Sequence, residues 1–192
     1  MADWTGNSAL IQGCNNRNVD GEKHDYYATD PIAMTMLLEK EDFYSYVWEC
    51  AVGGGHLAEV LKEHGYKIKC SDIIDRGYPN TKIIDFLTYL PEHKNNYDII
   101  TNPPYKYALE FVEHALDISM DSVKVAMFLK LTFLSSQKRK SLFLKRPPKK
   151  VYVFTNRIEC GKNGKFEGKT GVDYAWFIWE KGYKGPTILE WL

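Results

Sequence analysis

Features that define other classes of protein are missing from this chain of 192 residues. No apolar run approaches the roughly 20 residues that a membrane-spanning helix needs, so no membrane association is expected. The four cysteines are widely spaced and include no C-x-x-C pair. That spacing argues against a zinc site, predicts no metal, and is typical of free thiols in the cytoplasm. The first ten residues include Asp3 and Asn7 and no basic cluster before an apolar core, so no signal peptide is expected.

The composition is that of a globular protein, with 44% hydrophobic and 26% charged residues. The length suits one domain with a single substantial core. Residues 1–25 are rich in Asn, Gly and Asp and are expected to form an irregular arm. We expect residues 26–192 to form one domain, without a separate target-recognition domain.

Apolar strand-like runs alternate with amphipathic helical segments along the chain. Strands are predicted at 46–50, 67–71, 82–85, 97–101, 123–129, 150–154 and 174–179, and helices at 30–40, 56–64, 107–119 and 133–143. Such alternation predicts an α/β sandwich with a mainly parallel sheet. We also expect an antiparallel strand near the C-terminus. Folds of this kind bind ligands at the carboxyl ends of their strands.

A net charge of zero conceals an uneven distribution. Residues 1–120 carry 10 Lys/Arg and 19 Asp/Glu, whereas residues 121–150 carry 9 Lys/Arg and one Asp. We call these nine cations the basic block: Lys124, Lys130, Lys138, Arg139, Lys140, Lys145, Arg146, Lys149 and Lys150. The block suits either a phosphate backbone or a solvated helix face.

The most informative segment is Asn102-Pro103-Pro104-Tyr105, which follows the predicted strand 97–101. An exocyclic amine on a base is a poor nucleophile, because its lone pair is delocalised into the ring. An Asn oxygen and the next backbone carbonyl can accept both of its N–H bonds and aim the lone pair at an electrophile. The prolines fix φ and stiffen the loop, and the Tyr ring offers a stacking face.

A glycine loop, 49–57, joins the first long strand to the next helix. Glycines there let the backbone approach a ligand closely. Gly53-x-Gly55-x-x-Ala58 also fits a dinucleotide fingerprint, and Asp72 follows 17 residues after Gly55. The loop alone therefore indicates an adenosine-containing ligand without separating NAD from S-adenosylmethionine (SAM). Asp72 ends the second strand, where a carboxylate can accept from both ribose hydroxyls.

Taken in order, residues 26–31, the glycine loop, Asp72, Asp85-Phe86 and 102–105 resemble the gamma-type N6-adenine DNA methyltransferases. The chain is also similar to small methyltransferase-like proteins of phages and prophages. The resemblance covers roughly residues 24–180, and it implies a Rossmann-like class I methyltransferase with SAM as cofactor. It implies catalytic roles for 102–105, with Tyr105 stacking the base. The cofactor-binding residues that it implies are Tyr27, Thr29, Glu49, Ala51, Gly53, Gly55, Asp72, Ile73, Asp85, Phe86 and Asn102.

Within this resemblance, Thr29 would hold the SAM carboxylate, Asp72 the ribose hydroxyls and Asp85 the adenine amine, with Phe86 beside the ring. Phe166 is the nearest match to a second aromatic against the base, and Lys138, Arg139 and Lys140 would contact nucleic acid. The late segment 157–160 departs from the family pattern, because Cys160 stands where an aromatic is usual.

Three functions remain open from the sequence. The first is methylation of adenine N6 in DNA, with recognition by short basic segments or by a specificity partner. The second is methylation of adenine in RNA or of a glutamine amide in a protein. The third is a SAM-binding regulatory or anti-restriction protein without activity, which the departure at Cys160 supports and the intact 102–105 motif opposes.

Overall fold

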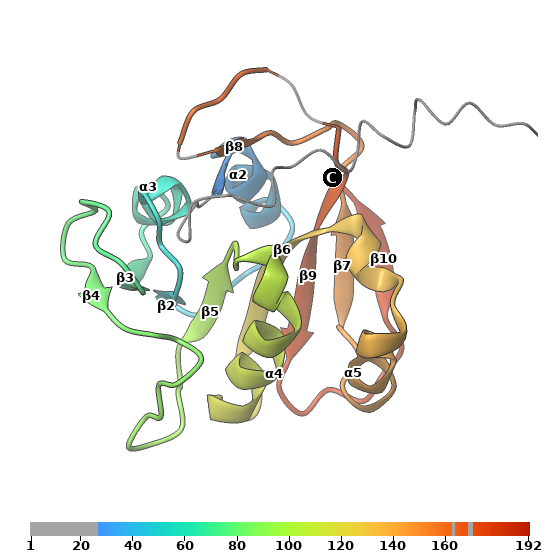
Figure 1. Ribbon diagram of the computed structural model, residues 1–192. Coiled ribbons are helices and arrows are strands. Elements are labelled where there is room, and N and C mark those ends of the chain that lie inside the picture. Colours follow the sequence, from blue (N-terminus) through green and yellow to red (C-terminus); the bar gives the residue numbers. More distant parts are fainter. Residues whose placement is uncertain (1–26, 163, 169–170) are drawn as a thin grey trace, which may run out of the picture.

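The computed structural model describes residues 27–162, 164–168 and 171–192 (Figure 1). The expected arm at 1–25 lies outside these ranges. In chain order the strands are β1 (Tyr27–Thr29), β2 (Tyr46–Glu49), β3 (Lys67–Asp72), β4 (Lys82–Ile83), β5 (Asp98–Thr101), β6 (Lys124–Lys130), β7 (Lys150–Val153), β8 (Cys160–Lys162), β9 (Tyr174–Glu180) and β10 (Ile188–Trp191). The helices are α2 (Ile32–Leu38), α3 (His56–Glu63), α4 (Ala108–Ile118) and α5 (Lys140–Lys145), with short 3₁₀ turns η1 (Tyr105–Tyr107), η2 (Leu131–Leu134) and η3 (Gln137–Arg139).

Eight strands form the main sheet in the order β10-β7-β9-β6-β5-β2-β3-β4. Strand β9 runs antiparallel to both neighbours, β6 and β7, and the other pairs in this sheet are parallel. The predicted α/β fold, mainly parallel with an antiparallel strand near the C-terminus, is confirmed. A dinucleotide-binding Rossmann sheet is mostly parallel, and in this sheet β9 is the strand that runs antiparallel, between β6 and β7.

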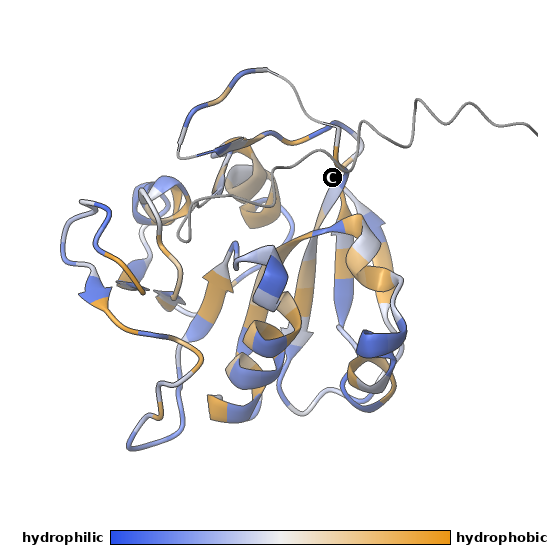
Figure 2. Cartoon of the chain, in the orientation of Figure 1, coloured by the Kyte–Doolittle hydropathy of each residue, from blue (hydrophilic) through white to orange (hydrophobic). Residues whose placement is uncertain are grey.

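Helices cover both faces of the sheet, α4 and α5 on one and α2 and α3 on the other (Figure 1). The central strands are apolar because both of their faces are buried, as the colouring of Figure 2 shows for β5 and β6. One core packs around Trp48 and α4, and the second packs around Trp176 and α2. The indole N–H of Trp176 donates to the carbonyl of Ala33, 2.9 Å away, which fixes α2 against β9.

The predicted helix at 133–143 is wrong. The segment instead forms η2, η3 and the six-residue α5. The guanidinium of Arg139 donates to the carbonyls of Thr132, Phe133 and Ser135, and Ser136 caps η3 by accepting from the Lys138 N–H. These bonds use carbonyls that a continuous helix would need for its own ladder. Strand β4 is also shorter than the predicted 82–85.

A second, two-stranded sheet was not predicted from the sequence. β1 pairs antiparallel with β8, and Thr29 lies opposite Cys160. Thr29 therefore belongs to a strand and does not cap α2, whose first N–H, from Ile32, donates to the Asp30 carboxylate at 3.0 Å. Figure 1 shows β8 beside α2, at the edge of the molecule toward which the β5 arrow points.

Candidate functional site

The topological switch point of the main sheet lies between β2 and β5, which are neighbours. From β2 the chain continues to β3 on one side, and from β5 it continues to β6 on the other. A crevice opens at such a point at the carboxyl ends of the strands. The glycine loop leaves β2 there, and Asn102 follows β5 there.

The glycine loop needs glycine at two positions. Gly53 has φ +56° and Gly55 has φ +87°, in the left-handed region that side chains avoid. The N–H of Gly53 donates to the Asp72 carboxylate at 2.8 Å, which ties the loop to the end of β3. A Cβ on Gly55 would lie 2.0 Å from the Tyr78 ring. Bare backbone at the start of α3 is therefore a requirement of this loop.

The side chain of Asn102 is held by strand β1. Its amide nitrogen donates to the carbonyl of Tyr27 at 2.8 Å and to the hydroxyl of Thr29 at 2.9 Å. With both hydrogens used, the side chain is fixed, and its oxygen is left as an acceptor. The structure thus brings together the predicted residues Tyr27, Thr29 and Asn102, across more than 70 positions of sequence.

Three buried side-chain oxygens among the described residues have no hydrogen-bond partner: Glu49 Oε2, Thr101 Oγ1 and Asn102 Oδ1. All three lie at the carboxyl ends of β2 and β5. Buried oxygens are rarely left without a donor, so the arrangement fits a ligand that brings donor groups to this point. The amino-acid end of SAM carries an ammonium, whose N–H groups are donors that Glu49 Oε2 and Thr101 Oγ1 can accept.

Glu49 has an unusual environment for a carboxyl group. It is buried, and its Oε1 accepts from the Ala51 N–H at 3.2 Å. Burial and, to a smaller extent, the nearby charge of Asp72 raise the pKa of Glu49 to about 8, against the lowering effect of its hydrogen bonds. The Glu49 carboxyl can therefore lose its proton when a cation is placed beside it.

Tyr105 stands in a cluster that includes residues not predicted from the sequence. Its hydroxyl lies 3.5 Å from the Cys160 sulfur, and its ring centroid is 5.9 Å from that of Tyr174 and 6.3 Å from that of Tyr27. The ammonium of Lys130 lies over the Tyr105 ring, 5.0 Å from its centroid. Burial raises the pKa of the Tyr105 hydroxyl well above its usual range, so it stays neutral. Only strand pairing between β1 and β8 brings Cys160 here, and no local pattern signals that.

One of the predicted cofactor residues, Phe86, is placed differently. Phe86 is 2% exposed and packs against Trp48, Phe111 and His114, so it is a core residue with no free face for an adenine ring. Asp85 is exposed and accepts from the Leu87 N–H at 3.1 Å within a turn. Ile73, next to Asp72, is 56% exposed and is open to a ligand.

Phe166 does not lie against Tyr105 in this structure. Its ring meets His56, the first residue of α3, edge to face with centroids 5.7 Å apart. Glu159 holds this loop by accepting from the N–H groups of Glu167 and Gly168. The described part of the loop around Phe166 therefore reaches toward the start of α3 and the glycine loop.

Most of the basic block serves the fold. Lys124 and Lys150 both pair with the buried Glu41, at 2.5 and 2.9 Å. These two lysines begin β6 and β7, so they lie at the edge opposite the crevice. The other internal pairs are Lys149 with Glu180 at 2.7 Å and Arg146 with Asp117 at 2.6 Å. A single phosphate-binding face made by the whole block is therefore excluded.

Of the three block residues predicted to contact nucleic acid, Lys138 and Lys140 are exposed. Arg139 is committed to the carbonyls around η2, and its guanidinium stacks 4.5 Å from the Phe133 ring centroid.

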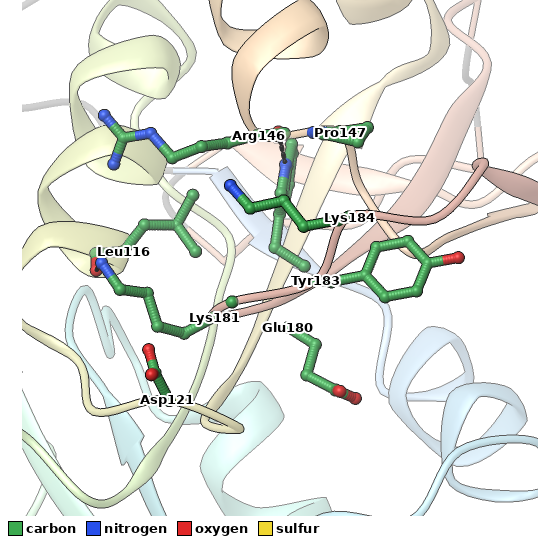
Figure 3. A pocket seen from close by; sticks show the side chains of 10 residues that line it. Leu116, Asp121, Arg146, Pro147, Glu180, Lys181, Tyr183 and Lys184 are labelled. Atoms are coloured by element: carbon green, nitrogen blue, oxygen red, sulfur yellow. Dashed lines mark hydrogen bonds between the residues drawn. The ribbon is translucent and has the colours of Figure 1, made fainter.

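A surface hollow of about 240 Å³ lies at the same opposite edge (Figure 3). Several of its polar groups are used by the fold, since the Lys181 ammonium donates to the carbonyl of Leu116 and the Trp179 indole donates to that of Arg146. None of the predicted site residues at the carboxyl ends of β2 and β5 lines this hollow. Within the described ranges, no helix is long and apolar enough to cross a membrane, and no cluster of three or more metal-ligating side chains occurs.

No family model and no curated protein matches the sequence. Solved structures do match the fold. The structure described as the modification subunit of a type I restriction enzyme from Vibrio vulnificus YJ016 aligns with 93% of this chain at a TM-score of 0.60 and 15% identity. The class I SAM-dependent methyltransferase from Listeria monocytogenes aligns with 84% at 0.57 and 13% identity, and the SAM-dependent O-methyltransferase from Thermotoga maritima with 81% at 0.53 and 13%.

This chain covers 48% of the Vibrio protein, 64% of the Listeria protein and 65% of the Thermotoga protein. It therefore spans about half the length of the first and a little under two thirds of the other two. With the antiparallel strand β9 in place, these similarities establish that the chain has the Rossmann-like fold of the class I methyltransferases.

Proposed function

We propose that the protein is a SAM-dependent N-methyltransferase whose acceptor is the exocyclic amine of adenine in DNA. One observation carries the proposal. The side-chain amide of Asn102 donates both of its hydrogens to residues of β1. Its buried oxygen, which lies beside the crevice, has no hydrogen-bond partner. An amine N–H is the donor that this oxygen lacks.

In this proposal, different residues of the chain bind different parts of SAM. Gly53 and Gly55 offer bare backbone, Asp72 at the end of β3 accepts from ribose hydroxyls, and Glu49 faces the cationic amino-acid end. SAM, when bound, supplies a methyl group on a positively charged sulfur, a strong electrophile. Asp72 already accepts from the Gly53 N–H, so the ribose site and the glycine loop are positioned together.

Asn102 Oδ1 and the Pro103 carbonyl accept the two N–H bonds of the amine and direct its lone pair toward the methyl carbon. With SAM bound, the methyl group would pass to this nitrogen, and the sulfur would keep the electron pair of the broken S–C bond. The nitrogen becomes cationic and then loses a proton to water, so no Lys or His base is required. Positioning supplies most of the rate enhancement.

A DNA acceptor is favoured over the alternatives by the resemblance of the 102–105 motif and by the structural similarity to a restriction-enzyme modification subunit. The basic block adds less support than its composition suggests, because much of it is paired internally. RNA adenine and a protein glutamine amide remain outcomes of the test.

The test is transfer from labelled SAM to unmethylated DNA, RNA and protein pools, followed by identification of the methylated atom. Asn102→Ala should lower transfer about 10²- to 10³-fold, as does removal of a key polar group from other active sites. Asn96→Ala, at an exposed Asn beyond the site, is the matched control and should retain full activity. Label confined to RNA or protein would overturn the DNA acceptor, and full activity of Asn102→Ala would overturn the proposed chemistry. SAM binding without transfer to any pool would favour a non-catalytic SAM-binding protein.

A further inference from the structure

A second hollow, of about 220 Å³, lies apart from the crevice, on the face of the sheet that α4 covers. Trp48 of β2 and Lys69 of β3, which are partners in the parallel ladder, line it from the sheet. Tyr89 and residues 91–97, which lead into β5, line the rest. No residue of the glycine loop after Trp48 and no residue of the 102–105 motif lines this Lys69 hollow, so it is separate from the proposed methyl-transfer site.

The ammonium of Lys69 has no acceptor within the described ranges. It lies 3.5 Å from the centroid of the Trp48 ring and 4.9 Å from that of the Tyr89 ring, and no hydrogen bond or ion pair joins it to a described residue. Other half-buried lysines of this fold do have carboxylate or carbonyl acceptors, namely Lys124, Lys149, Lys150 and Lys181. A partly buried cation without an acceptor is costly, so Lys69 fits a ligand that supplies one.

The charge balance around Lys69 agrees with this geometry. Burial and, after it, the nearby charge of Lys82 lower the pKa of Lys69, against the opposing effect of Cys50. The fold therefore does not provide the anion that would offset the burial of this ammonium.

The walls of the Lys69 hollow are held in place by the fold. Trp48 is 0% exposed beneath the ammonium, and its indole N–H donates to Ser71 Oγ at 2.8 Å. The Tyr89 ring meets the Trp48 ring edge to face, with centroids 5.3 Å apart. The side-chain amide of Asn95 donates to the Tyr97 carbonyl at 2.7 Å and accepts from the Tyr97 N–H at 3.3 Å. A ligand would therefore meet a site that needs little ordering.

Other polar side chains line the Lys69 hollow as well. His93 and Asn96 are exposed there, and no hydrogen bond to a described residue uses their side chains. Lys94 instead donates to the carbonyl of Asp117. Glu92 is the one carboxylate among the described lining residues, and it is exposed and forms no ion pair with Lys69. The hollow is smaller than the roughly 300–1,000 Å³ of sites for drug-sized ligands, which limits its occupant to a small molecule.

We propose that the Lys69 hollow binds a small organic oxyanion, a carboxylate or a phosphate, with the Lys69 ammonium as its counter-ion and the half-buried rings of Tyr89 and Tyr97 beside its carbon part. The ammonium can keep its contact with the Trp48 ring while its N–H groups donate to the oxyanion. No existing contact has to be given up, and the bond gained is charge-assisted. The site does not depend on the proposed methyl transfer.

The experiment follows the side chain of Lys69 by NMR in protein that carries isotope-labelled lysine, with the signal assigned by its loss in Lys69→Met. The probes are benzoate, phenyl phosphate and benzamide, which has the shape of benzoate without its charge. At constant pH and ionic strength, at least one of the two anions should move the Lys69 signal to saturation and raise the pKa of Lys69, and benzamide should do neither. Saturation by benzoate alone would assign a carboxylate, and saturation by phenyl phosphate alone would assign a phosphate.

Calorimetry on variants measures what the ammonium contributes. Lys69→Met should weaken the bound anion about 10- to 100-fold, as expected for loss of a charge-assisted hydrogen bond, and Lys69→Arg should retain most of the affinity. Lys67→Met, on the same strand but outside the lining of the hollow, is the matched control and should bind as wild type does.

Three outcomes would overturn the inference. In wild type, absence of a saturable shift with both anions would leave Lys69 as a lysine packed on aromatic rings, and an equal shift with benzamide would show that charge is not recognised. Unchanged affinity in Lys69→Met would place the anion elsewhere. Methyl transfer is measured separately, so its failure and the failure of this site are distinguishable.

Discussion

At Gly55 the absence of a Cβ decides whether the glycine loop can lie against Tyr78. The Tyr78 ring fills the place of that Cβ, and its hydroxyl donates to Glu59 at 2.7 Å, which secures it on α3. The segment after β3 and the start of α3 are therefore packed as one unit around bare backbone. Glycine at this position serves both the positive φ and the close approach.

We predict that Gly55→Ala is much more harmful than Gly65→Ala, although both positions have similar φ, +87° and +84°. No atom lies within 4 Å of a Cβ on Gly65, so that change should cost about 1 kcal/mol for strain alone. Gly55→Ala should cost roughly 1–3 kcal/mol more, as overpacking does. Urea denaturation measures both, and in a Tyr78→Ala background the excess cost at Gly55 should disappear. An equal loss for both variants in the wild-type background would contradict this packing.

Glu49 predicts a dependence of stability on pH. Because burial raises its pKa in the folded state to about 8, above the ordinary value of 4.5, the folded protein holds a proton that the unfolded chain releases. The stability from this group is complete below about pH 4.5 and is lost as the pH rises through 8. The free energy of unfolding of wild type should therefore fall relative to that of Glu49→Gln between pH 5 and 8. Parallel curves for the two proteins would show that Glu49 is ionised throughout.

On the scale of elements, the sequence predicts what local pattern determines. The buried runs of β5 and β6 and the positive-φ glycines before α3 are visible as apolar stretches and turn residues, and the structure has them. The two-stranded sheet of β1 and β8 has no such signal, because three-residue strands whose paired residues are 131 to 135 positions apart pair only once the fold exists. That pairing places Thr29 opposite Cys160 at the site, so the sequence could name both residues through the resemblance but could not predict the contact of Cys160 with Tyr105.

The described part of the loop that carries Phe166 lies against the start of α3, next to the glycine loop, and this changes what removal of the Phe166 ring should do. Phe166→Ala removes the edge-to-face contact with His56 at the start of α3, a contact of about 0.5–1.5 kcal/mol. We expect SAM affinity to fall roughly 2- to 12-fold while the KM for DNA changes little. Tyr44→Ala, at an exposed ring before β2 on the opposite edge, is the control. If Phe166→Ala instead raised only the KM for DNA and left SAM affinity unchanged, Phe166 would be assigned to the base pocket.

At the scale of the whole molecule, charged side chains at the end of the sheet opposite the crevice pair with one another. Glu41 is buried with Lys124, Lys150 and the Tyr152 hydroxyl at the edge where β6 and β7 begin. These hydrogen bonds lower the pKa of Glu41 against the opposing effect of burial, so the cluster is ionised and structural. Composition alone cannot distinguish such lysines from those free to bind a ligand, because the difference depends on where each strand begins.

The segment 138–140 allows structure and substrate binding to be separated by neighbouring substitutions. Arg139→Ala removes a guanidinium that donates to three carbonyls and should destabilise the protein by about 1–3 kcal/mol. Its DNA affinity at matched folded fraction should be unchanged.

The double variant Lys138→Ala with Lys140→Ala removes exposed charges and should alter stability by less than about 0.5 kcal/mol. If these lysines meet phosphates, the double variant should reduce the salt slope by about 0.9 for each contact, at every DNA sequence alike. If the double variant kept the salt dependence of wild type, this surface would be only solvated. If Arg139→Ala lowered the slope of log DNA affinity against log salt without loss of stability, the guanidinium would contact the substrate.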